Sequence, residues 1–320
     1  MRSIDVFNGD ADGICALHQL RLHTPRPGAQ LVTGVKRDIR LLRRVEEAVG
    51  CQLTVLDISL DANRAELERL LASGNTVLYA DHHYSGELPV SGALTAYIDP
   101  SPHTCTSLIV DRLLAGRFRL WALVGAYGDN LDETATALAE ASGLRAGDAG
   151  ILRELGQLLN YNGYGSTEAD LHVPPADLYR ELCRFADPLE FAGQSALLAG
   201  LREGHDRDMA RTEELTPRWS FTAGHVYLLP AAPWARRVVG VFANRIARQE
   251  PDLAHATLIP NTDGSLLVSV RAPRNNRLGA DSLCRQFPTG GGRSAAAGIN
   301  QLPPELLDSL LATFAAHFTA

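Results

Sequence analysis

The chain lacks the features that mark membrane or secreted proteins. Its longest apolar stretches, such as residues 120–128, fall short of the roughly 18 residues that span a bilayer. The five cysteines are odd in number and scattered without metal-like pairing, and the N-terminus has no basic-then-apolar leader pattern. We therefore expect a soluble, cytoplasmic protein with cysteine thiols and no membrane partner.

Positive charge is also in short supply. Lysine and arginine together number 30 against 37 acidic residues, which gives a net charge of −7. A broad surface that binds duplex nucleic acid needs an excess of basic residues, so the composition counts against a nonspecific duplex-binding protein. A local basic cleft is still compatible with this composition. With 320 residues, 45% of them hydrophobic, the chain is long enough for a substantial core and two domains.

The order of apolar runs predicts the fold class. Up to about residue 100, short apolar runs such as IDVF and VLYADHH alternate with amphipathic stretches such as GICALHQLRLH. This alternation predicts a parallel sheet with helices on its faces, hence an α/β protein. Residues 104–160 read as mainly helical, and a strand-helix alternation resumes near residue 218.

We therefore predict two α/β domains joined by a helix. The N-terminal parallel-sheet domain spans residues 1–186, a polar linker helix spans 187–217, and a smaller C-terminal α/β domain spans 218–320. Within the first domain, one helix is expected to be capped by Asp61 and to end at Gly74.

Aspartates follow three of the predicted strands. Asp10 and Asp12 lie in the loop NGDADG, Asp57 ends the strand LTVLD, and Asp81 ends VLYAD and is followed by His82. Taken singly, each aspartate reads more simply as a turn residue. Residues just beyond the carboxyl ends of parallel strands converge on one crevice, however. The joint arrangement therefore favours a shared metal site.

The chemistry of this site follows from its charges. Asp129 in GAYGDN is expected to join it from a helix terminus. Several carboxylates cannot all stay ionised in a dry cleft without a cation. Carboxylates and imidazole without cysteine suit Mn²⁺, with Mg²⁺ or Co²⁺ as alternatives. Two ions about 3.5 to 4 Å apart can hold a hydroxide and clamp a phosphoryl group, so we predict phosphoester hydrolysis.

Four ordered motifs resemble the DHH phosphoesterase family, named for the triplet at 81–83. NGDADG, LDIS, ADHH and GAYGDN take the places of its four motifs. VSVRA and GGGRSAAAG near the C-terminus resemble the associated domain of the RecJ-like and oligonucleotide-degrading branches. The resemblance implies a DHH catalytic domain followed by a C-terminal, substrate-binding DHH-associated domain.

The resemblance also implies a role for each motif residue. Asp10 would bind the first of two ions, and Asp57 would bridge both. Asp81 would support the metal ligands, and His83 would contact the phosphate; we take these two as the catalytic residues. The implied metal ligands are Asp10, Asp12, Asp57, His82 and Asp129.

Two positions depart from the family pattern. The family usually has a further His or Asp upstream of the paired aspartates, where this chain has Asn8, a neutral and weaker ligand for the metal or its surroundings. The number of ions, one or two, is therefore open. Arg293 stands where the associated domain commonly has histidine, and an arginine keeps a phosphate contact.

We expect the glycine run to form a tight turn that opens a closely packed helix, with a purely structural turn as the alternative. The residues expected to bind substrate phosphate are Arg271, Gly290, Gly291, Gly292 and Arg293.

The sequence thus predicts a Mn²⁺-dependent phosphoesterase that acts, like an exonuclease, on single-stranded or short nucleic acid or nucleotides. Cyclic dinucleotides or 3′-phosphoadenosine phosphate are alternative substrates, and pyrophosphate or polyphosphate is a weaker one. A noncatalytic nucleic-acid-binding subunit is the alternative from another class. A homodimer is left open.

Overall fold

The computed structural model describes residues 2–318, and the chain divides into two compact units. The division falls between Gly204 and His205, within helix α9 (Ala196–Arg211). The segment expected to be one linker helix, residues 187–217, contains α8 (Pro188–Gln194), α9 and the 3-10 turn η4 (Thr212–Glu214). The boundaries at residues 186 and 217 stay predictions.

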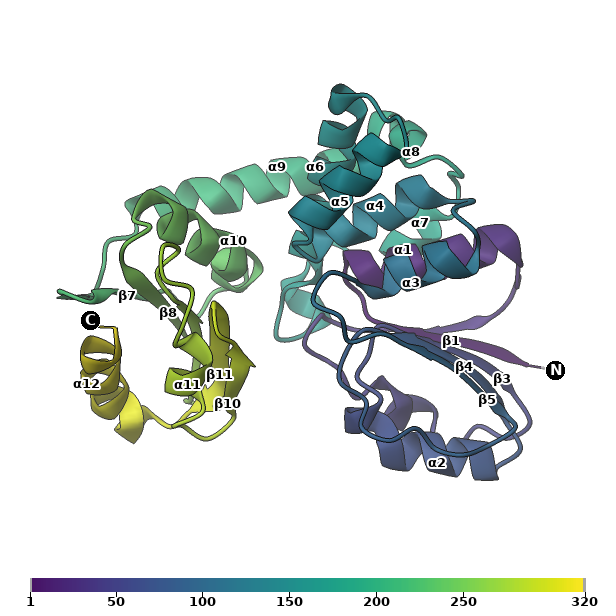
Figure 1. The fold of residues 1–320 in the computed structure, drawn as a ribbon, viewed down its shortest axis with the longest axis horizontal. Coiled ribbons are helices and arrows are strands. Elements are labelled where there is room, and N and C mark those ends of the chain that lie inside the picture. The colour runs from purple at the N-terminus through teal and green to yellow at the C-terminus, as the bar shows by residue number, and fades with distance from the viewer. Residues whose placement is uncertain (1, 319–320) are drawn as a thin grey trace. The chain divides into compact units, whose positions relative to one another are not determined.

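The first unit is built on a five-stranded sheet in the order β2-β1-β3-β4-β5, and every neighbouring pair is parallel (Figure 1). This confirms the predicted parallel sheet. The strands are β1 (Ser3–Phe7), β2 (Gln30–Val32), β3 (Gln52–Leu56), β4 (Thr76–Asp81) and β5 (Leu94–Ile98).

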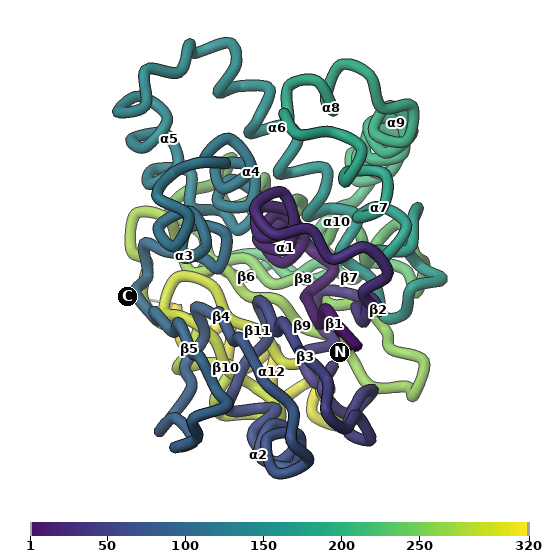
Figure 2. The backbone as a smooth tube through the Cα atoms, turned by 90° about the vertical axis from the view of Figure 1, so that its right-hand side faces the viewer, coloured from purple at the N-terminus to yellow at the C-terminus, as the bar shows by residue number. Residues whose placement is uncertain are grey.

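Alternate residues of these strands bury against opposite layers. Ile4 and Val6 of β1 belong to the core beneath the 3-10 turn η1 (Leu41–Val45) and α2 (Arg64–Ala72), whereas Phe7 belongs to the core on the other face. Figures 1 and 2 show α1 and α2 on opposite sides of the sheet. The other helices of the unit are α1 (Ala11–His23), α3 (Thr106–Leu113), α4 (Arg119–Gly128), α5 (Asp132–Ala141), α6 (Ala146–Gly163), α7 (Pro175–Leu182) and the 3-10 turn η3 (Glu168–Asp170).

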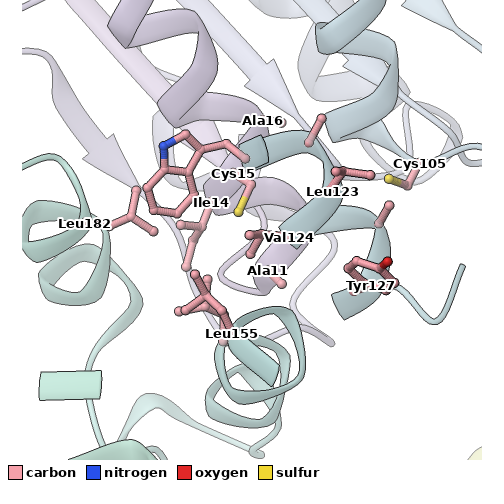
Figure 3. Packing of buried hydrophobic residues seen from close by; sticks show 14 of the residues in the cluster. Ala11, Ile14, Cys15, Ala16, Cys105, Leu123, Val124, Tyr127, Leu155 and Leu182 are labelled. Carbon is pink, nitrogen blue, oxygen red and sulfur yellow. The ribbon is translucent and has the colours of Figure 1, made fainter. Parts of the chain in front are cut away.

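Helix α1 lies at the centre of the larger core. Its residues 11–19 are all buried, because the sheet and neighbouring helices enclose it. Figure 3 shows Ile14 and Cys15 of α1 among side chains of α4 and α6, including Val124 and Leu155. A helix enclosed in this way fixes the loop that precedes it, which is the loop containing Asp10.

The strand order creates the place for a ligand. The chain leaves β1 for β2 on one side and then returns past β1 to form β3 on the other side. At such a reversal the connections after the two strands run in opposite directions and leave a crevice at the carboxyl edge. The loops after β1 and β3 are those that carry NGDADG and Asp57.

The start of α2 differs from the prediction. Asp61 lies in a 3-10 turn, η2 (Asp61–Asn63), and the α-helix begins only at Arg64, without a side-chain cap. Asn63 is buried and its side chain accepts a hydrogen bond from the amide of Leu42 at 3.2 Å, so it ties the turn to η1 instead. Gly74, with φ of +75°, ends the helix as predicted.

The second unit is built on a six-stranded sheet in the order β10-β11-β9-β8-β7-β6, in which only β7 and β8 run parallel. Helix α10 packs on one face, and α11 and α12 pack on the other (Figure 1). The elements are β6 (Trp219–Phe221), β7 (Gly224–Leu228), α10 (Pro233–Gln249), β8 (Ala254–Pro260), β9 (Leu266–Arg271), α11 (Ala280–Cys284), β10 (Gly290–Arg293), β11 (Ala296–Leu302), η5 (Pro304–Leu306) and α12 (Leu307–His317).

The glycine run is a strand, so its prediction as a turn that opens a helix is wrong. β10 pairs antiparallel with β11, and the residues after the glycines form the second strand of this hairpin. A Cβ on Gly290 would lie 1.8 Å from the carbonyl oxygen of Cys284, and one on Gly292 would lie 2.5 Å from Ala297 Cα. Close packing requires these two glycines, and glycine carries no strand signal in a sequence.

All five cysteines are unpaired thiols, and only Cys183 is exposed. Among the described residues, no helix is both long enough and apolar enough to cross a membrane.

A matched pair of leucines tests the core of the first unit. Leu155 is 1% exposed and packs against α1, whereas Leu88 is 45% exposed. We expect Leu155→Ala to lower the free energy of unfolding by about 2–5 kcal/mol, because it leaves a cavity. Leu88→Ala should change it by less than about 0.5 kcal/mol. Urea unfolding followed by circular dichroism measures both; equal effects would contradict this core.

Candidate metal centre

The loop after β1 is held by its own polar groups. Asp10 caps α1, because its Oδ1 accepts hydrogen bonds from the amides of Asp12 at 3.0 Å and Gly13 at 3.1 Å. Asn8 Oδ1 accepts from the amide of Asp10 at 3.2 Å, and Asn8 Nδ2 donates to the carbonyl of Lys36 at 3.1 Å. The side chains of Asn8, Asp10 and Asp12 are buried. The side chain of Asn8 therefore links the backbone of Asp10 to the backbone of Lys36.

Asp12 is fixed by the start of helix α3. Its Oδ2 accepts from the amide of Thr106 at 2.7 Å, and its Oδ1 accepts from the amide and hydroxyl of Ser107 at 2.7 and 2.5 Å. A Cβ on Gly125 would lie 2.0 Å from Ser107 Oγ, so α4 can approach this carboxylate only with glycine there. Gly125 of GAYGDN thus lets this motif approach Asp12 of NGDADG.

Asp57 has an unusual backbone. Its φ is +59°, in the left-handed region that few residues other than glycine adopt. The amide of Asp57 donates to the carbonyl of Ala80 at 3.1 Å, and its Oδ1 accepts from the hydroxyl of Thr106 at 3.0 Å. Strained backbone of this kind concentrates at functional sites. It turns the chain sharply at the carboxyl end of β3.

The two histidines after β4 lie in different surroundings. His82 is buried, with Nε2 3.5 Å from Asp57 Oδ1 and 3.8 Å from Asp129 Oδ2. The side chain of His83 is 42% exposed, and its Nδ1 lies 2.6 Å from Asp81 Oδ1. Around an ion with bonds of about 2.1 Å, ligand atoms lie about 3 to 4 Å apart. His82 Nε2 thus lies at ligand spacing from an oxygen of Asp57 and from an oxygen of Asp129, as two ligands of such an ion would.

His83 can also take part. Asp57, His82 and His83 each offer one ligand atom, and these atoms lie within 4.8 Å of one another. Burial alone would lower the pKa of His83, but the hydrogen bond and charge of Asp81 raise it above its usual value. His83 therefore holds its proton more readily than a free histidine does, which suits contact with an anion.

The carboxylates are short of positive charge. Burial raises the pKa of Asp57 well above its usual range, and Asp12, Asp10, Asp129 and Asp81 raise it further. Burial also raises the pKa of Asp129, although a lysine partly offsets this. A divalent cation relieves this repulsion, so these residues fit the metal that the sequence predicts.

The lysine is Lys36, which the sequence motifs did not indicate. Its Nζ contacts Asp10 Oδ2 and lies 3.0 Å from Asn160 Oδ1 and 3.4 Å from Asp129 Oδ1. Burial would lower the pKa of Lys36, but Asp10, Tyr164 and Asp129 raise it well above its usual value. One signal was present, because Lys36 is the only lysine among the 30 basic residues of the chain.

Lysine also decides the state of Asp10. Burial acts to raise the pKa of Asp10, but Lys36 and the hydrogen bonds from Gly13 and Asp57 together outweigh it, and the pKa falls below its usual value. Asp10 therefore loses its proton more readily than Asp57 does in the metal-free protein.

The two arginines predicted to bind phosphate in the second unit share one face of its sheet. Arg293 pairs with Ala296, and Ala296 pairs with Arg271, so the three side chains form a cross-strand row. Arg271 Nε donates to Asn244 Oδ1 at 2.8 Å, which orients the guanidinium, and Arg293 is exposed. A Cβ on Gly291 would meet nothing within 4 Å, so packing does not require glycine there.

Comparisons with known proteins agree with this description of the fold. The sequence matches no protein-family model and no curated protein. Solved structures do match. RecJ from Thermus thermophilus in complex with Mn²⁺ has a TM-score of 0.65 and 20% identity over 98% of this chain and 51% of its own, so this chain spans about half the length of that RecJ.

Two further structures align over most of both chains. An exonuclease RecJ bound to manganese has a TM-score of 0.61 and 21% identity over 98% of this chain and 89% of its own. PggH from Vibrio cholerae, a pGpG-specific phosphodiesterase, has a TM-score of 0.54 and 13% identity over 99% of this chain and 100% of its own. The chain therefore has the two-domain fold of the DHH proteins, and the resemblance predicted from the motifs is confirmed at the level of fold.

The raised pKa of Asp57 gives a test of the site in the metal-free protein. The folded pKa lies above the unfolded one, so Asp57 lowers stability at neutral pH; this cost shrinks as the pH falls below the folded pKa and is gone below the unfolded pKa. We expect Asp57→Asn to raise the melting temperature in EDTA at pH 7.5 by roughly 2 to 4 °C for each kcal/mol of repulsion removed.

The same variant should gain nothing from Mn²⁺, whereas Mn²⁺ should raise the melting temperature of the wild-type protein. Differential scanning fluorimetry measures both effects. A wild-type protein that is indifferent to Mn²⁺, with a variant that melts earlier, would show that the carboxylates have a purely structural role.

Proposed function

We propose that the chain is a metal-dependent phosphodiesterase that hydrolyses short single-stranded oligonucleotides from an end. The observation that carries the proposal is the place of His82, at ligand spacing from both Asp57 and Asp129, together with the raised pKa of Asp57. Buried carboxylates of this kind are arranged for a cation. The crevice at the carboxyl edge of a parallel sheet is also where such folds bind ligands.

Asp57, His82 and Asp129 would hold the ion, and we expect Mn²⁺, with Mg²⁺ or Co²⁺ able to replace it. When bound, a divalent ion lowers the pKa of a coordinated water, which would supply the hydroxide that attacks phosphorus. The ion also neutralises charge on the phosphoryl oxygens. Asp12 would stiffen this group, because the amides of Thr106 and Ser107 hold both of its oxygens.

His83 would contact the phosphate. Its Nδ1 is engaged by Asp81 Oδ1, so Nε2 remains as the donor that can reach a ligand, and nearly half of the side chain is exposed. A protonated imidazole there donates a charged hydrogen bond to a phosphoryl oxygen. Asp81, which is fully buried, keeps the proton on Nδ1 and the ring in one orientation.

Three observations favour short oligonucleotides over long DNA. The net charge of −7 disfavours a long electrostatic track. The chain aligns with the whole of the pGpG-specific phosphodiesterase but with only half of the longer RecJ. The second unit offers Arg271 and Arg293 on one face with small residues between and beside them, which suits a phosphate next to a flat group.

A second candidate function is a noncatalytic nucleic-acid-binding subunit. It is favoured by Asn8, which stands in a ligand position of the family pattern, and by Lys36, which engages Asp10 Oδ2. In this case the ammonium would stabilise the carboxylates without any ion. Calorimetric titration with Mn²⁺ distinguishes the two functions, because the subunit would bind none.

A substrate panel tests the proposed activity. With Mn²⁺, we expect the purified protein to cleave labelled di- to pentanucleotides of RNA or DNA faster than a cyclic dinucleotide, 3′-phosphoadenosine phosphate or pyrophosphate. Asp57→Ala should lower kcat by at least about 10³-fold, because the group at the carboxyl edge loses its central carboxylate. Undiminished Mn²⁺-dependent hydrolysis by Asp57→Ala would refute the proposed mechanism.

The second unit is tested by a matched pair of arginines. We expect Arg271→Ala to raise KM for a dinucleotide about 10-fold or more with little change in kcat, since a charged hydrogen bond contributes about 1.5–3 kcal/mol. Arg285, which is exposed and pairs with Asp281 at 3.5 Å, is the control, and Arg285→Ala should leave KM unchanged. Steady-state kinetics on the same dinucleotide measure both, and equal KM values would exclude Arg271 as a substrate contact.

A further inference from the structure

The ammonium of Lys36 has the surroundings of a bound cation. It has three N–H donors, and three side-chain oxygens from distant parts of the chain lie around it: Asp10 Oδ2, Asn160 Oδ1 at 3.0 Å and Asp129 Oδ1 at 3.4 Å. Two of these oxygens belong to carboxylates that the family pattern assigns to metal binding. The ammonium thus lies among oxygens that could otherwise coordinate a metal ion.

The backbone of Lys36 is also fixed. Its amide donates to the carbonyl of Gly163 at 2.8 Å, and its carbonyl accepts from Asn8 Nδ2 at 3.1 Å. The residue that fills the first ligand position of the family pattern therefore holds the lysine in place. Asn8 Oδ1 is engaged as well, by the amide of Asp10. Asn8 acts as a support for Lys36, with neither end of its amide left for another task.

Asp10 has each of its oxygens in use. Oδ1 caps helix α1, and Oδ2 contacts Lys36. An ion at Asp10 would have to displace the ammonium and repel it from a pocket that is mostly buried, since the side chain of Lys36 is 21% exposed. Ion binding at this position is therefore opposed by both contact and charge.

The exchange conserves charge. An aspartate at position 8 with a divalent ion beside it would contribute a net +1, and Asn8 with the ammonium of Lys36 also contributes +1. The ammonium of Lys36 thus compensates electrostatically for the neutral Asn8 and for one ion, and the other residues of the site need not change.

We propose that Lys36 takes the place of one of the two ions of a two-metal centre, so that the chain binds a single divalent ion beside a resident ammonium. The inference rests on the proposed function and names the second cation of that site. In the working enzyme the ammonium offsets the charge of Asp10 and part of the charge of Asp129.

The use of lysine supports this role. Arginine supplies every other basic residue of the chain, so a lysine is retained only here. A compact ammonium with tetrahedral donors can replace a metal ion among three oxygens, whereas the planar fork of a guanidinium cannot. We therefore expect Lys36→Arg to be as damaging as Lys36→Met, with kcat lowered about 10²-fold or more in each.

The first test counts ions by native mass spectrometry and Mn²⁺ calorimetry. We expect one Mn²⁺ per wild-type chain and two per chain in the double variant Asn8→Asp, Lys36→Met, which restores the missing carboxylate and removes the ammonium. Arg40→Met removes a charge from the same loop, where Arg40 pairs with Glu66 at 3.2 Å, and should still bind one ion. Two ions in the wild-type protein would overturn the proposal.

The second test uses the wild-type protein alone. Because Lys36 is the only lysine, acylation by an amine reagent followed by peptide mass spectrometry reports on one side chain, apart from the N-terminal amine. We expect Lys36 to stay protected both in EDTA and in saturating Mn²⁺, and to react fully in urea. Faster acylation with Mn²⁺ would mean that an ion displaces the lysine, and fast acylation in EDTA would mean that it is not held; either result overturns the proposal.

The proposed function and the role of Lys36 fail in different ways. Mn²⁺-dependent hydrolysis with two bound ions would overturn the role of Lys36 and leave the proposed function standing. A wild-type chain that binds no Mn²⁺ and cleaves nothing would overturn the proposed function and this inference with it.

Discussion

The candidate metal centre depends on one constraint: several buried carboxylates share the carboxyl edge of a parallel sheet and cannot all be ionised there without positive charge. The fold meets part of this need itself. The amides at the start of α3 hold Asp12, and Lys36 holds Asp10. The remaining repulsion falls on Asp57, the carboxylate whose pKa is raised most clearly by its neighbours. An added cation therefore stabilises the site most beside Asp57 and His82, because Asp10 and Asp12 already have partners.

The fold brings these groups together through close approaches between helices and loops. Asp10 both begins α1 and faces Lys36, so a single side chain joins helix capping to the charge balance of the site. The buried course of α1 fixes that cap from below, and the glycine at position 125 lets α4 reach the carboxylate of Asp12. The positive φ of Asp57 places strain at the same edge. Rigidity here comes from packing as much as from hydrogen bonds, as preorganised sites require.

Much of this arrangement could be predicted from the sequence, for a physical reason. Parallel strands buried on both faces read as continuous apolar runs, and a carboxylate that follows such a run must lie at one edge of the sheet. Lys36 could not be found in this way. It lies in an aperiodic loop, and its partners Asp10 and Asn160 are 26 and 124 residues away. The glycine strand β10 was missed because steric demands at Gly290 and Gly292 come from neighbouring strands and helices that the local sequence does not show.

A resident ammonium and a metal ion differ in the chemistry they can support, even where they balance the same negative charge. Both neutralise carboxylates and attract a phosphate, but an ammonium has no coordinated water to make acidic, and it cannot leave. If Lys36 serves as the second cation, generation of the nucleophile must belong to the group around Asp57, His82 and Asp129 alone. The positive charge beside Asp10 would then be present in every molecule, at any metal concentration. The chain would depend on a single metal-binding equilibrium in place of two.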